Sequence, residues 1–173
     1  MTAPHSPVYQ AYYTRMPWQL LSGVGWKRLV AFRADESGVT LGGPVTRYPR
    51  FTVVVPWWDI EAVVLWSTKK TMERPIRWIG LKLRPGVPDP PGPNHGLTPQ
   101  LSAGIAPHIE HEVVRNSRFI ALWKVDHTRL STAMQAFAPQ VQLRVHPVHK
   151  VVPQGPGTRL GNGSGGSIFD IMP

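Results

Sequence analysis

Short runs of β-branched and aromatic residues, each ended by turn-forming residues, dominate the sequence between residues 26 and 125. The clearest runs are residues 26–33, 39–41, 51–55, 60–66 and 77–83. Runs of this length favour strands, and the Asp-Glu-Ser-Gly cluster at 35–38 indicates a hairpin turn between the first two. The sequence therefore predicts antiparallel β-structure built from short strands.

The run at 60–66 has apolar residues on both faces of the expected strand. Every second residue from Ile60 to Trp66 falls on one face, and Val63 and Leu65 fall on the other. We therefore expect both faces of this strand to be covered. Residues 112–115 and 119–125 are a second hairpin candidate, which brings the expected number of strands to about seven.

The spacing of the apolar residues changes after residue 125. Asp126 can cap a helix by accepting backbone N–H bonds, and Pro139 prevents the helix from continuing. Between them, apolar residues follow at i, i+3, i+4 and i+7: Leu130, Ala133, Met134 and Phe137. This predicts a helix over 127–138 whose apolar stripe covers a sheet. Residues 141–145 could add one more short strand.

Proline and glycine mark the segments outside the expected core. The 173 residues include 19 Pro and 16 Gly, more than ordinary domains use. Residues 1–24 are expected to be a weakly ordered arm, 84–109 a mobile Pro-rich insertion, and 146–173 a disordered Pro/Gly-rich tail. One domain over 25–145 remains.

The residues offer little for catalysis or metal binding. The chain has no Cys, no Gly-x-Ser-x-Gly motif and no phosphate-binding loop placed between a strand and a helix. His108, Glu110, His111 and Glu112 lie close in sequence, but on a strand the two His point to opposite faces. We therefore expect a polar loop end there, and neither an enzyme nor a cofactor.

A short segment after the third expected strand carries a family resemblance. Pro56, Trp57, Trp58, Asp59 and Ile60 follow a Gly-Val-Thr-Leu strand, and a strand at 119–125 leads directly into the predicted helix. The sequence of about residues 25–145 resembles that of bacterial pleckstrin-homology-like (PH-like) proteins of uncharacterised actinobacterial type. The resemblance implies a mainly β, α+β fold: a partly open barrel of about seven antiparallel strands capped by one C-terminal helix.

A structural role is the simpler interpretation of this motif. Either Trp57 or Trp58 would cover the barrel edge where Pro56 interrupts the ladder, and Asp59 would accept a hydrogen bond from a backbone donor left free there.

Basic residues are the main functional signal. The formal net charge is +9, and Lys69, Lys70, Arg74 and Arg77 form a candidate anion-binding cluster in which Glu73 is the only acid. An ordinary solvated basic surface is the alternative. In the PH-like proteins that the sequence resembles, the members that bind phosphoinositides use basic residues around the first hairpin loop. The turn at 34–38, taken as that loop, is acidic, which argues against such binding.

These observations predict a non-catalytic binding or scaffolding module, with an unknown protein as the expected partner. Peripheral binding to anionic lipids through the 69–77 loop is one alternative. Nucleic-acid binding is a second, suggested by a sequence pI of about 10.5 and by Trp beside Arg, as at 77–78. The N-terminus does not resemble a secretory signal and no run is long enough to span a membrane, so we expect a cytoplasmic protein, at the inner membrane face under the lipid alternative.

Overall fold

The computed structural model describes residues 7–15, 17, 27–68 and 75–147. Its first four strands form one antiparallel sheet, sheet A, in the order β1-β2-β3-β4. They are β1 (Tyr9–Tyr12), β2 (Val30–Asp35), β3 (Gly38–Leu41) and β4 (Val53–Val55). The predicted hairpin around residues 35–38 is therefore the β2–β3 hairpin, and β1 is an additional strand within the expected arm.

The later strands form a second sheet, sheet B, in the order β7-β6-β5-β8. They are β5 (Ile60–Thr68), β6 (Ile76–Leu83), β7 (Ser117–Phe119) and β8 (Gln142–His146). Three of these strands are antiparallel, whereas β8 pairs with β5 in parallel. Across the described ranges the fold is thus α+β with two four-stranded sheets that do not close into one barrel.

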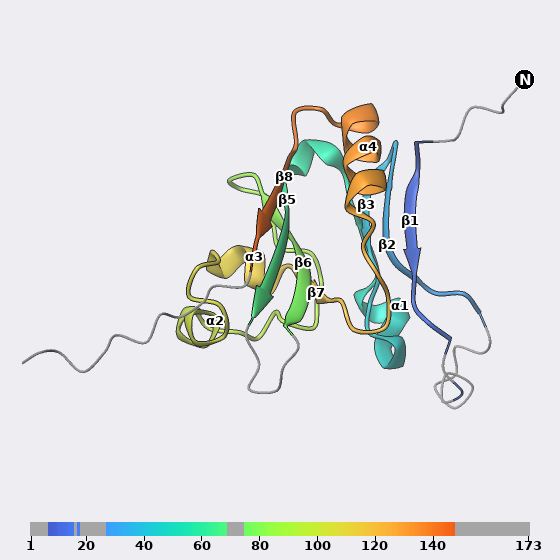
Figure 1. Ribbon diagram of the computed structural model, residues 1–173. Coiled ribbons are helices and arrows are strands. Elements are labelled where there is room, and N and C mark those ends of the chain that lie inside the picture. The colour runs from blue at the N-terminus through green and yellow to red at the C-terminus, as the bar shows by residue number, and fades with distance from the viewer. Residues whose placement is uncertain (1–6, 16, 18–26, 69–74, 148–173) are drawn as a thin grey trace, which may run out of the picture.

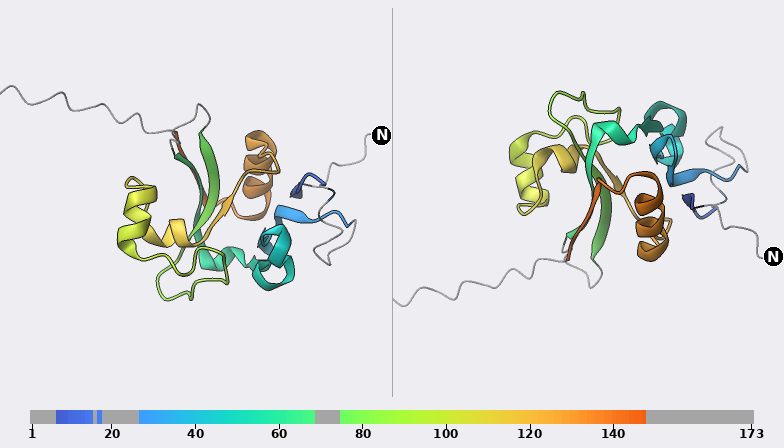
Figure 2. Two further views of the ribbon diagram at one scale, coloured as in Figure 1. Left: turned by 90° about the horizontal axis from the view of Figure 1, so that it is seen from below. Right: turned by 90° about the horizontal axis from the view of Figure 1, so that it is seen from above.

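Short helices connect and cover the sheets. They are η2 (Val45–Arg47), α1 (Tyr48–Phe51), η3 (Trp57–Asp59), α2 (Pro99–Ile105), α3 (His111–Arg115) and α4 (His127–Phe137). The sheets stand side by side with α4 between them, while α2 and α3 cover the other side of sheet B (Figures 1 and 2). Sheet B is therefore the central layer of the molecule.

Strand β5 contributes to two cores, as its two apolar faces predict. Val63 and Leu65 pack in the core between the sheets and α4, whereas Val64 and Trp66 pack against the α2–α3 region. Ile60 belongs to the first core, not to the face of Val64 as the period-two pattern predicted. The reason is a register shift between Ile60 and Ala62 in the pairing with β6, which reverses the face.

The predicted helix over 127–138 is present as α4, and the predicted cap is present too. A side-chain oxygen of Asp126 accepts a 3.0 Å hydrogen bond from the backbone N of Arg129. Leu130 and Met134 are buried in the core, and Phe137 is partly buried against it. The helix contacts β1 and β2. It is therefore docked mainly on sheet A.

Residues 111–125 differ from the predicted hairpin. Residues 111–115 form α3, and only Ser117–Phe119 pairs with β6. Val113 and Val114 both pack against the outer face of β5. Consecutive side chains of a strand point to opposite faces, so only a helical turn can bury both on one side. The tertiary contact with β5 overrides the β-propensity of this segment.

The Pro-rich segment 84–109 also contains structure that its sequence does not predict. Helix α2 begins with Pro99 at its first position, and the side chain of Thr98 accepts a 3.3 Å hydrogen bond from the backbone N of Leu101. Proline and threonine are common at these positions of a helix. Whether the segment moves stays a prediction. The tail from residue 148 onward lies outside the described residues.

Candidate functional site

Of the four residues predicted to bind anions, only Arg77 lies within the described residues. It is exposed on β6, opposite Ser67 of β5. Lys69, Lys70 and Arg74 lie outside the described residues. The predicted loop cluster therefore stays a prediction.

Arg77 lines a hollow of about 360 Å³ at the end of the β5–β6 hairpin. Lys124, His127 and His146 line it as well, so every ionisable side chain in its wall is a base. Apolar side chains, including Trp123, form much of the remaining wall. The hollow is thus a basic depression beside the start of α4.

The segment 56–60 connects sheet A to sheet B through η3. Trp57 is 5% exposed, and its Nε1 donates a 2.6 Å hydrogen bond to the backbone O of Asp35. Trp58 is 72% exposed. The backbone N of Asp59 donates to the O of Pro56 at 3.0 Å, and its backbone O accepts from the N of Arg84 at 2.9 Å. Trp57 therefore covers the end of sheet A, and the main chain of Asp59 secures the turn.

Five exposed basic residues lie at one end of sheet A, which we call the basic end: Arg15, Lys27, Arg28, Arg47 and Arg50. The first three belong to the β1–β2 connection and the last two to the β3–β4 connection. Both connections lie at the same end because β1, β2, β3 and β4 are successive antiparallel neighbours. The topology alone therefore gathers these charges.

Specific bonds hold the two connections of the basic end together. The hydroxyl of Tyr48 accepts a 3.1 Å bond from the backbone N of Val30 and donates a 3.0 Å bond to its O. These bonds fix α1, and with it Arg47 and Arg50, against the first residue of β2. On the neighbouring connection, the guanidinium carbon of Arg28 lies 4.2 Å from the ring centroid of Tyr12, a cation–π contact.

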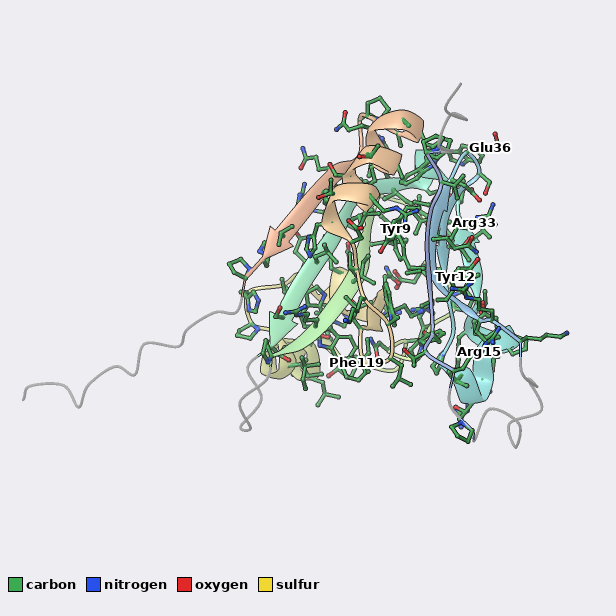
Figure 3. All side chains as sticks on the ribbon, turned by 45° about the vertical axis from the view of Figure 1, so that its right-hand side comes forward. Tyr9, Tyr12, Arg15, Arg33, Glu36 and Phe119 are labelled. Carbon is green, nitrogen blue, oxygen red and sulfur yellow. The ribbon has the colours of Figure 1, made fainter. Side chains whose placement is uncertain are left out.

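Acidic side chains are confined to the opposite end of this sheet. Of the ten Asp and Glu residues, none falls within 1–34 or 37–58. Asp35 and Glu36 are at the β2–β3 turn, and Figure 3 shows Glu36 at the far end of sheet A from Arg15. Asp35 also forms an ion pair with Arg33 at 2.6 Å. The basic end is therefore not neutralised by acids of its own sheet.

Asp35 is held in its charged form by its neighbours. Burial raises the pKa of its carboxyl group, but two hydrogen bonds from Ser37 and the guanidinium of Arg33 outweigh burial and hold the pKa below its ordinary value. The bonds to Ser37 run from its backbone N (2.9 Å) and its hydroxyl (2.6 Å).

The structure changes which turn is the first hairpin connection. The acidic turn at 34–38 joins β2 to β3, whereas the first connection is residues 13–29 and contains Arg15, Lys27 and Arg28. The first connection is therefore basic, and the acidic turn at 34–38 does not argue against binding of phosphoinositides. The local sequence pattern does not predict β1, and so it does not predict this arrangement, although the lack of acids across the first 34 residues is a usable signal.

Arg118 is a buried cation that the sequence pattern did not single out. It is 2% exposed, and its guanidinium donates to the backbone O of Gly42 (3.2 Å), Phe51 (3.1 Å), Pro91 (2.9 Å) and Ser117 (3.3 Å). Burial lowers its pKa to about 10, so it stays charged at neutral pH. It holds β7 against the β3–β4 connection, at the basic end of sheet A, and against the Pro-rich segment.

The His-rich segment does not assemble a metal site in the part of the chain that the structure describes. Glu110 pairs with Lys82 at 3.0 Å. The Nδ1 of His111 lies 2.7 Å from the Oγ of Ser102, a pairing that resembles part of a nucleophilic site. Ser102 is, however, 1% exposed. This contact therefore satisfies a buried hydroxyl and offers no access for a substrate.

A scan against protein-family models found no match, and searches of the curated proteins and of the solved structures found none either. Over the described ranges, no helix combines the length and apolar character needed to cross a bilayer.

Proposed function

We propose that this protein is a non-catalytic binding module that attaches to anionic membrane surfaces through the basic end. The observation that carries this proposal is the gathering of five exposed cations on two adjacent connections that contain no acid. A Lys or Arg near an anionic lipid surface contributes about 1 kcal/mol. Five of them together contribute about 5 kcal/mol, a factor of several thousand in affinity. This attachment would place the protein at the inner face of the cytoplasmic membrane.

A divergent PH-like fold is the second part of the proposal. Four antiparallel strands, then the antiparallel set β5-β6-β7, then helix α4 is the order of elements in the PH fold that the sequence resembles. The parallel strand β8 and the α2–α3 insertion depart from that plan. Under the resemblance, basic residues around the first hairpin loop bind headgroups. Here that loop supplies three of the five cations.

Vesicle flotation with two charge-matched variants tests the proposal. The first variant, Arg15→Gln/Lys27→Gln/Arg47→Gln, removes three cations of the basic end that are all exposed. The control, Arg84→Gln/Lys124→Gln/Arg129→Gln, also removes two Arg and one Lys from exposed positions elsewhere. On vesicles with anionic lipid, the first variant should bind roughly a hundredfold more weakly than the wild-type protein, and the control should lose much less.

Two outcomes would contradict the proposal. If both variants lost vesicle binding equally, net charge alone would drive binding, without a dedicated surface. Absence of wild-type binding at low salt would exclude a lipid surface as the partner. A third variant, in which Lys69, Lys70, Arg74 and Arg77 are all Gln, tests the predicted loop cluster in the same assay.

A protein partner is the second candidate, and the exposed Trp58 favours it. Trp58 is 72% exposed and Val54 on β4 is 51% exposed. Exposed Trp is enriched among residues that dominate protein interfaces. If a protein binds here, partners that co-purify with the wild-type protein should be lost with Trp58→Ser and kept with the basic-end variant.

Nucleic-acid binding has weaker support. A single-strand binding surface needs exposed aromatic rings beside a basic groove. Among the described Trp residues only Trp58 is exposed. The η3 turn that carries it lies beside the acidic β2–β3 turn, at the far end of sheet A from the basic end. The exposed indole and the cations therefore do not form one surface.

A further inference from the structure

A second hollow, of about 310 Å³, lies between the basic end of sheet A and the facing part of sheet B. Sheet A contributes Tyr13 and the start of η2 to its wall, and sheet B contributes Trp78, Arg118 and Phe119. Ala121 and Leu122 complete one side, and the backbone O of Leu122 accepts a 2.6 Å hydrogen bond from the N of Thr14. The volume is near the lower end of the range for small-molecule sites, about 300–1,000 Å³.

The wall of this hollow is mainly apolar and contains one full charge. Arg118 and Tyr13 are its only ionisable lining residues, and no acid lines it. Phe119, which is 46% exposed, forms an apolar rim. In the described ranges no carboxylate pairs with Arg118. A positive charge in a poorly solvated wall attracts an anion more strongly than the same charge in water.

Arg118 and Tyr13 each keep a hydrogen-bond donor for a ligand. A guanidinium has five N–H groups, and the four bonds to backbone oxygens leave one on Nη1 of Arg118. Within the described part of the chain, no residue forms a hydrogen bond with the hydroxyl of Tyr13. Burial dominates the pKa of Tyr13 and raises it to about 12, although the charge of Arg118 opposes this effect. Tyr13 is therefore a protonated donor at neutral pH.

We propose that this hollow binds a small apolar carboxylic acid, with Arg118 and Tyr13 receiving the carboxylate and the apolar wall receiving the body of the ligand. Two donors match the two oxygens of one carboxylate. A single cation in the wall selects a monoanion, because a second negative charge would be buried without a partner. The hollow opens close to the basic end, since Thr46 in its lining precedes Arg47. The ligand site is nonetheless distinct from the membrane-binding surface.

Calorimetric titration of the full chain with 2-naphthoate and with 2-naphthalenemethanol tests this proposal. The two probes share the same ring system and differ in charge. The wild-type protein should bind the acid at least tenfold more tightly than the alcohol. Tyr13→Phe should weaken binding of the acid about tenfold, the effect of losing one hydrogen bond to a charged group, and leave the alcohol unchanged.

Two further variants complete the design. Ala121→Trp should abolish binding of both probes, because the indole would occupy the hollow. Tyr12 is a neighbouring phenol outside the lining, so Tyr12→Phe should leave the affinity for both probes unchanged. A variant of Arg118 is not used, because this residue also holds the two sheets together and its loss would affect folding as well as binding. Tyr13→Phe should float with anionic vesicles like the wild-type protein, which separates this site from the basic end.

Several outcomes would overturn the proposal. One is equal affinity of the wild-type protein for the acid and the alcohol. Another is unchanged affinity for the acid in Tyr13→Phe and Ala121→Trp. A third is the absence of binding heat with millimolar 2-naphthoate.

Discussion

The indole of Trp57 reaches back to the β2–β3 turn and donates a 2.6 Å hydrogen bond to the backbone oxygen of Asp35. Its neighbour Trp58 points to solvent. Trp57→Ala should therefore lower the free energy of unfolding by about 3–5 kcal/mol, because it leaves a large cavity. Trp58→Ala should change it by about 0.5 kcal/mol or less. Urea denaturation of both variants measures the difference, and equal losses would contradict the assigned roles.

Replacing the buried cation Arg118 should be costly. Arg118→Met leaves the carbonyl oxygens of Gly42, Phe51 and Pro91 without their donor. Each buried unpaired group costs about 1–3 kcal/mol, so a total loss of about 3 kcal/mol or more is expected in urea melts. Arg129→Met, on the exposed side of α4, is the control and should be nearly neutral. If Arg118→Met left the free energy of unfolding unchanged, the hydrogen bonds of Arg118 would not stabilise the fold.

Asp35 should make stability depend on pH in the acidic range. Its pKa in the folded protein lies below the ordinary value of about 3.9. The stabilisation is therefore fully present above that ordinary value and is lost as the pH falls through the lower, folded-state pKa. Thermal melts of Asp35→Asn and the wild-type protein should differ at pH 7 and converge towards pH 2. A constant difference across this range would contradict the role of the charge.

Helix α4 should depend more on Met134 than on Phe137. Met134 is fully buried, whereas Phe137 is only partly buried against the core. Met134→Ala should cost about 2–5 kcal/mol, and Phe137→Ala should cost less than the 3–5 kcal/mol typical of a fully buried Phe. Gln135→Ala, on the exposed face of the same helix, provides the control. The reverse order in denaturant melts would mean that the helix is rotated on sheet A.

Elements with a strong local pattern could be predicted from the sequence. The cap at Asp126, the stripe from Leu130 to Phe137 and the stop at Pro139 specify α4 without any distant contact. Strands β5 and β6 likewise carry their own alternation of apolar residues. Strand β1 has only four residues, and its neighbouring prolines hide any period. Such a strand is stabilised by pairing with β2, which a local pattern does not contain.

The candidate sites depend on the tertiary structure for the same reason. The sequence by itself determined that the chain is basic, and that Asp35 and Glu36 are the only acids among its first 58 residues. Only the pairing of β1, β2, β3 and β4 decided that Arg15 and Arg47 share one end of a sheet. Arg118 is the clearest case, because it bonds to Gly42, 76 residues earlier in the chain. Burial of a charge is decided by segments that approach from far along the sequence, and local propensity carries no information about them.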